Sequence, residues 1–133
     1  MRHLYPAVFL LLCLVVPSPP AAGPRVVTLD LVKANPGERD RLVRYYRLNW
    51  ERARATVLAS NQIVGYRMLT GSDTGSRWDV ALETEYADSA AYARAEAIFQ
   101  PVLQAQGRTL VDGKSRAELG TIVESRVTTV TAP

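Results

Sequence analysis

The spacing of apolar side chains in this chain changes repeatedly between the two-residue period of a β-strand and the 3.6-residue period of an α-helix. Alternation predicts strands over residues 26–32, 62–70, 78–86 and 121–130, and helical spacing predicts helices over residues 36–57 and 89–99. The predicted order is therefore strand, helix, strand, strand, helix, strand. Within one small domain this order predicts an α+β fold of the ferredoxin-like βαββαβ type, an antiparallel sheet with two helices on one face.

The first predicted strand separates an apolar set from a polar set. Val27, Leu29 and Leu31 alternate with Thr28 and Asp30, and we expect the apolar set to face the helices. The polar set would then lie on the uncovered face, together with three residues of the third strand: Asp79, Ala81 and Glu83. A face of this mixed character in the middle of the sheet predicts that a second copy covers it, giving a homodimer.

Local signals predict where the helices begin and end. Asn35 is expected to cap the first helix, with Pro36 in its first position and Glu38 closing a capping box. Asp88 is expected to cap the second helix, and Pro101 predicts a kink or a restart. Residues 107–117 are expected to form a loop.

Residues 1–23 have the three parts of a secretory signal peptide: basic residues, an apolar run of 13 residues, and small residues with prolines. We expect them to be removed, leaving residues 24–133 as a single domain that is secreted or periplasmic. The only histidine and the only cysteine, His3 and Cys13, lie in this leader. The mature chain therefore lacks the residues for disulfides, Cys or His zinc sites, His-ligated haem or a Ser-His-Asp triad. No metal and no cofactor is expected.

Charge is nearly balanced in the predicted mature chain. Without Arg2, 15 Lys and Arg residues stand against 13 Asp and Glu residues. The two signs are interleaved, as in the Arg47 and Glu51 pair on the first helix. Because nucleic acids and anionic membranes select clustered basic patches, neither is an expected partner after the leader is removed.

Two stretches carry a resemblance to a known family: VKANPGE at residues 32–38 and LETEYADSAAY at residues 82–92. They resemble the dimeric α+β barrel superfamily, in particular its antibiotic-biosynthesis-monooxygenase-like branch. Known members include cofactor-independent monooxygenases of polycyclic phenols, haem-degrading enzymes and proteins with no assigned reaction. The haem-degrading members use a Trp near the end of strand three and a His on the next helix. In this chain Tyr86 and Glu96 fall near those positions, so the resemblance implies the cofactor-free chemistry.

Several residues are candidates for a ligand site. Asn49 falls on or beside the apolar face of the first helix, where its amide is expected either to bind a ligand carbonyl or phenol, or to pair with a neighbouring group. Arg67 is expected either to bind a substrate anion or to pair with Glu83 or Asp79. The remaining candidates are aromatic residues, which either line a slot for a flat ligand or fill the core: Tyr46, Trp50, Tyr66, Tyr86 and Tyr92.

Two hypotheses remain open at this stage. In the first, the homodimer binds a small apolar or aromatic molecule between helices and sheet, and the enzyme version is a cofactor-independent monooxygenase. In the second, the fold is a non-catalytic structural or protein-interaction module. The sequence does not decide whether the chain is an enzyme. A cavity of roughly 300 Å³ or more between Tyr46, Asn49, Tyr66 and Tyr92 would favour the first hypothesis, and a filled core there would contradict it.

Overall fold

The computed structural model describes residues 23–72 and 75–131, so the predicted leader lies outside the described residues except for Gly23. Four strands form one antiparallel sheet in the order β2-β3-β1-β4: β1 (Arg25–Ala34), β2 (Gly65–Thr70), β3 (Val80–Tyr86) and β4 (Gly120–Val130). Together with the helices between them, this order is the ferredoxin-like βαββαβ topology. The predicted fold class is confirmed.

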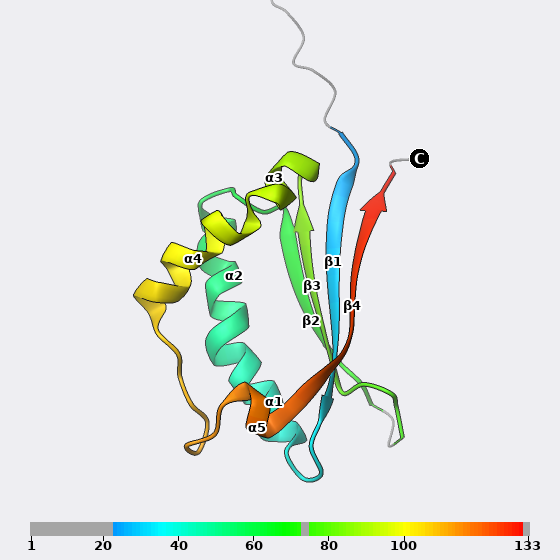
Figure 1. Cartoon of the computed structure of the whole chain (residues 1–133), viewed down its shortest axis with the longest axis vertical. Helices are drawn as coiled ribbons and strands as arrows, with labels where there is room; N and C mark the ends of the chain where they lie inside the picture. The colour runs from blue at the N-terminus through cyan, green and yellow to red at the C-terminus, as the bar shows by residue number, and fades with distance from the viewer. Residues whose placement is uncertain (1–22, 73–74, 132–133) are drawn as a thin grey trace, which may run out of the picture.

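The helices all lie on one side of the sheet, and the other side is bare in the monomer (Figure 1). The first helical stretch is continuous and consists of α1 (Arg39–Tyr46), a π-helical turn η1 (Arg47–Glu51) and α2 (Arg52–Ala59). The second consists of α3 (Ser89–Ala93) and α4 (Ala95–Gln106), and a short helix, α5 (Arg116–Leu119), precedes β4. In Figure 1, α4 lies against α2 rather than directly on the sheet. No helix in the described part of the chain is long and apolar enough to cross a bilayer.

The predicted capping box at the first helix is wrong. The helix begins at Arg39, because residues 35–38 form a turn in which the Glu38 N–H donates to the Asn35 carbonyl and Gly37 has a φ of 76°. The Asn35 side chain instead donates to the carbonyl of Glu118 at 3.0 Å. The Asn35 side chain therefore bonds to a distant segment, although the local sequence predicted that it would cap the helix.

The predictions for the second helix are partly confirmed. The Asp88 carboxylate accepts from the Ala91 N–H at 2.7 Å and caps α3 as expected. The break lies at Arg94, where φ and ψ are −91° and 4°, and Pro101 lies inside α4. The predicted loop at 107–117 contains the start of α5, whose capping box joins Ser115 and Glu118. The Ser-x-x-Glu pattern was present in the sequence and signals this helix.

The expected orientation of β1 is also wrong. Strand register pairs Thr28 with Thr84 and Asp30 with Leu82, and both partners are buried beneath the helices. Thr28 and Asp30 therefore face the helices, and the outer face carries three apolar residues of β1: Val27, Leu29 and Leu31. The helix side of β1 is apolar only near its ends, where Val26 and Val32 are buried. The two polar residues between them have polar partners: the Thr28 hydroxyl donates to the Thr84 carbonyl at 3.4 Å, and the Asp30 carboxylate accepts from the Ser125 hydroxyl at 2.5 Å.

The apolar core is divided into two clusters beneath the helices. One is built on Val32, Leu42, Tyr45, Tyr46, Val80, Leu82, Val111 and Leu119. The other is built on Val26, Val57, Ile63, Tyr86, Ala91 and Phe99. Trp50 packs against the first cluster and Phe99 belongs to the second. The side chain of Arg54 lies between these two aromatic rings, at the junction of the clusters.

Ion pairs surround the apolar residues on the outer face of the sheet. Arg25 pairs with Glu85 at 2.8 Å, and Arg126 pairs with Glu124. The neighbouring edge strand β4 is exposed along most of its length, and its exposed Val130 lies on this outer face. Register places the exposed Ile122 and Val127 on the other side, opposite Val32 and Thr28. This face is therefore an apolar strip with charged borders, and in the monomer it is only partly shielded from water.

Candidate functional site

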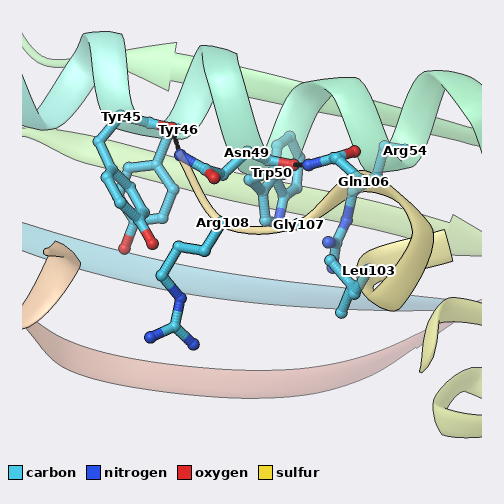
Figure 2. A pocket seen from close by; sticks show the side chains of 9 residues that line it. All are labelled: Tyr45, Tyr46, Asn49, Trp50, Arg54, Leu103, Gln106, Gly107 and Arg108. Atoms are coloured by element: carbon cyan, nitrogen blue, oxygen red, sulfur yellow. Dashed lines mark hydrogen bonds between the residues drawn. The ribbon is translucent and has the colours of Figure 1, made fainter. Parts of the chain in front are cut away.

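A pocket of about 270 Å³ opens between the first helical stretch and the end of α4. Figure 2 shows aromatic side chains reaching into it from α1 and η1, with α4 and the following segment forming the other wall. Its lining residues are Tyr45, Tyr46, Asn49, Trp50, Arg54, Leu103, Gln106, Gly107 and Arg108. The volume is slightly below the roughly 300 Å³ expected of a ligand site. Of the four residues named with that threshold, Tyr46 and Asn49 line the pocket and Tyr66 and Tyr92 do not.

Asn49 is buried in η1, where a π turn leaves backbone carbonyls available to other donors. Its Nδ2 donates to the Tyr45 carbonyl at 2.9 Å and to the Thr109 carbonyl at 2.9 Å. Its Oδ1 accepts from the Thr109 N–H at 2.8 Å. Both amide hydrogens are therefore used within the protein, as in the interpretation in which Asn49 pairs with neighbours. A contact between Asn49 and a ligand stays a prediction.

The segment of residues 107–115 that joins α4 to α5 is held against the pocket by contacts at several points. Gln106, just before it, donates from Nε2 to the Asn49 carbonyl at 2.8 Å. Asp112 accepts from Arg41 and from Arg44, at 2.8 Å in each case, and these guanidinium groups lower the pKa of its carboxyl. Lys114 pairs with Glu38. The wall of the pocket is therefore tied to α1 and η1 rather than being a free loop.

Tyr46 brings a buried hydroxyl to the pocket. Only 4% of the residue is exposed, and within the described residues its hydroxyl makes no hydrogen bond. Burial raises the pKa of Tyr46 to about 12, while the charge of the nearby Arg116 guanidinium and a contact with it that lies outside normal hydrogen-bond geometry act in the opposite direction. A neutral phenol without a hydrogen bond of normal geometry is costly in a protein interior, and its O–H remains free to donate to an acceptor placed beside it.

Arg54 is a pocket residue that the sequence analysis did not identify. In a straight α-helix it would lie about 120° around the axis from Leu42, among the outward-facing arginines. The π turn at residues 47–51 contains about one extra residue. Every later side chain is therefore rotated back around the helix axis by about 100° relative to its position in a straight α-helix. This rotation brings Arg54 into the pocket. Burial lowers the pKa of Arg54 to about 10, and the group remains a cation at neutral pH.

The other predicted aromatic residues lie outside the lining of this pocket. Tyr66 on β2 packs edge-to-face against Trp50, with ring centroids 5.8 Å apart. Tyr86 and Tyr92 pack against each other at 5.5 Å in the second core cluster. Tyr66, Tyr86 and Tyr92 therefore pack as core residues next to the site. A direct contact between any of them and a ligand stays a prediction.

Arg67 does not join the pocket. Its guanidinium forms a two-pronged ion pair with Glu83 on the outer face of the sheet, with Nη2 to Oε1 at 2.8 Å and Nη2 to Oε2 at 3.0 Å. Strand register places Arg67 opposite Glu83, on the side of the sheet away from the helices. The expected alternative to anion binding, a cross-strand ion pair, is the arrangement in the structure.

The chemistry of the pocket is that of aromatic walls with cationic and phenolic donors. Tyr45, Tyr46 and Trp50 provide ring surfaces, while Arg54 and Arg108 provide guanidinium groups. Within the described residues no group of three or more His, Cys, Asp and Glu side chains is arranged to hold a metal ion. Such a lining can hold a flat molecule and stabilise negative charge on it through hydrogen bonds and positive charge.

Comparison with solved structures places this chain among proteins with the same fold. A conserved protein of unknown function from Bacteroides thetaiotaomicron, described as a possible oxidoreductase, has a TM-score of 0.52 at 14% identity, over 81% of this chain and 99% of the other. HapK from Hahella chejuensis has a TM-score of 0.50 at 13% identity, over 77% and 90% of the two chains. At such identities the similarity establishes the ferredoxin-like α+β class of the protein and nothing finer.

A cofactor-independent oxygenase, SnoaB from Streptomyces nogalater, is also similar, with 18% identity over 84% of this chain and 95% of the other and a TM-score of 0.46. No protein-family model matches the sequence, and no curated protein is significantly similar to it. The function therefore has to be argued from the residues of the pocket.

Proposed function

We propose that this protein binds a small, flat, mostly apolar or aromatic molecule in the pocket beneath η1. The observation that carries the proposal is the unpartnered hydroxyl of Tyr46 beside an opening of about 270 Å³ with aromatic walls. Buried hydroxyls in folded proteins nearly always have a partner. A ligand carbonyl, phenol or enol in the pocket would provide that partner.

The enzyme version of this proposal is a cofactor-independent monooxygenase acting on a phenolic substrate. In that reaction a CH₂ group of the substrate becomes C=O, one atom of dioxygen is inserted, and the other leaves as water without an external reductant. The cations of Arg54 and Arg108 would stabilise the substrate anion that reacts with dioxygen. The description of the Bacteroides thetaiotaomicron protein as a possible oxidoreductase is compatible with this version.

The proposal includes export and a homodimer. The leader pattern of residues 1–23 supports export to the periplasm or the exterior. The half-buried Val27, Leu29 and Leu31 on the outer face of β1 support a dimer, because a second sheet packed on this face would remove them from water.

Native mass spectrometry of the full chain, expressed in a bacterial host with an export pathway, tests these statements together. We expect a dimer of a chain that has lost about 23 residues, with additional mass from a retained small molecule. Oxygen consumption with 1,8-dihydroxyanthrone, a polycyclic phenol, would support the enzyme version. A monomer without additional mass would contradict the proposal.

A non-catalytic interaction module is the second candidate function. The observation that favours it is the exposure of apolar side chains along β4, which presents a surface whether or not the pocket is occupied. A dimer that retains no small molecule and shows no oxygen consumption with the anthrone would favour this candidate over the first.

A further inference from the structure

Arg54 is held between two aromatic rings at the inner end of the pocket. Its guanidinium carbon lies 4.6 Å from the centroid of the Trp50 ring and 4.3 Å from the centroid of the Phe99 ring. In Figure 2 the group extends from α2 alongside Trp50 and Leu103. Contacts of this kind shield a guanidinium from water on its faces and leave the N–H groups at its edge as its polar surface.

Few of these N–H groups are used within the protein. A guanidinium has five, and the hydrogen bond that Arg54 makes in the described part of the chain runs from Nε to the Thr84 hydroxyl at 3.3 Å. Arg54 has no ion pair among the described residues, whereas the more exposed Arg25, Arg41 and Arg67 pair with carboxylates. Arg54 is thus a desolvated arginine whose guanidinium has no direct carboxylate partner in the described part of the chain.

The surrounding charges compensate for this only in part. The carboxylate that acts on Arg54 is that of Asp30 on the helix side of β1, and it already accepts from the Ser125 hydroxyl at 2.5 Å. The other charged groups nearby are cations: Arg108 lines the pocket and Arg116 acts on Tyr46. The pocket is therefore positively charged. A partly desolvated cation without a counter-ion is unfavourable unless another molecule supplies the negative charge.

We propose that Arg54 binds an acidic group of the ligand: a carboxylate, or the ionised oxygen of an enol or phenol. This inference rests on the proposed function, because it describes the molecule that occupies the same pocket. The free edge of the guanidinium matches a carboxylate with two parallel N–H bonds. The aromatic part of the ligand lies against Trp50 and Tyr45. The ligand class is therefore an aromatic acid or an acidic phenol rather than a neutral hydrocarbon or a base.

Two fluorescent probes of nearly equal shape separate charge from apolar binding. 2-Naphthoate carries a carboxylate, and 2-naphthamide replaces it with a neutral amide. By fluorescence titration of the full chain after export, we expect 2-naphthoate to bind about tenfold or more tightly, a ratio equivalent to about 1.4 kcal/mol. In Arg54→Met this preference should disappear while the affinity for 2-naphthamide changes less than about threefold, because methionine keeps the apolar contacts.

The matched control is Arg52→Met, which removes the same charge from an exposed position two residues earlier on α2 and should leave the preference unchanged. If Arg54→Met does not fold, Arg54→Lys is the second variant. Lysine keeps the positive charge but lacks the planar pair of N–H donors, so a reduced preference for 2-naphthoate over 2-naphthamide is expected. An equal affinity of the wild type for both probes would overturn this inference while leaving the proposed function intact. Binding of neither probe would overturn both this inference and the proposed function. If Arg54→Met still preferred 2-naphthoate, a group other than Arg54 would bind the carboxylate, and this inference would be wrong.

Discussion

Replacement of Asn49 by alanine should unfold the wall of the pocket before it affects the rest of the fold. The amide makes three hydrogen bonds: two, to the backbone N–H and carbonyl of Thr109, join η1 to the 107–115 segment, and one goes to the Tyr45 carbonyl in α1. Asn49→Ala removes all three and leaves these backbone groups to find other partners. Water can reach Thr109, which is exposed, but Tyr45 is buried.

The expected loss of stability follows from this difference. A hydrogen bond contributes about 1 kcal/mol net, and a buried group left without a partner costs about 1 to 3 kcal/mol. Rehydration at Thr109 offsets part of the total, so we expect a loss of about 2 to 3 kcal/mol. For a domain of this size such a loss lowers the melting temperature by roughly 10 °C.

Urea unfolding followed by circular dichroism measures this change, with Thr109→Ala as the control. Thr109 contributes only backbone groups to the hydrogen bonds with Asn49, so its substitution should cost less than about 0.5 kcal/mol. A loss below about 0.5 kcal/mol for Asn49→Ala would refute the structural role of the amide. If 2-naphthoate binding disappeared at unchanged stability, Asn49 would be a ligand contact instead.

Two further substitutions test the burial of Tyr46 and the packing of β4. Because burial raises the pKa of Tyr46 from 10.0 to about 12, its contribution to stability is present below pH 10 and is lost as the pH rises toward 12. Tyr46→Phe should remove a phenolate absorbance step near pH 12 without lowering stability at pH 7, and a loss above about 1 kcal/mol would contradict the unpartnered hydroxyl. Gly120→Ala should cost about 1 to 3 kcal/mol in urea unfolding, since its Cβ would lie 2.6 Å from the Lys33 carbonyl. Gly65→Ala, with nothing within 4 Å, is the comparison, and equal losses would refute the argument.

The order of the secondary-structure elements was predictable because hydrophobic period is a local property of the chain. Strand-like alternation over residues 78–86 identified β3, and the Asp88 cap set the start of α3. Boundaries were less predictable where distant segments compete for the same group. Asn35, expected to cap a helix, bonds to Glu118 across 83 residues of sequence, and no local pattern encodes that choice.

The candidate site was predicted in part. Tyr46, Asn49 and Trp50 line the pocket because helical spacing correctly placed them on the inward side. Arg67 was assigned to a substrate in one interpretation, but it lies on the outer face because strand register fixes which side it takes. The sequence pattern alone does not say which side of a sheet the helices cover.

The sequence by itself determined the class of fold, a small α+β domain, and the absence of histidine and cysteine from residues 24–133. Only the tertiary structure decided that Thr28 and Asp30 face the helices and that the π turn rotates Arg54 into the pocket. The physical reason is that periodicity reflects which side chains avoid water, which is a property of neighbours in sequence. The face that is covered, and the cation left without a counter-ion, depend on packing between segments far apart in the chain.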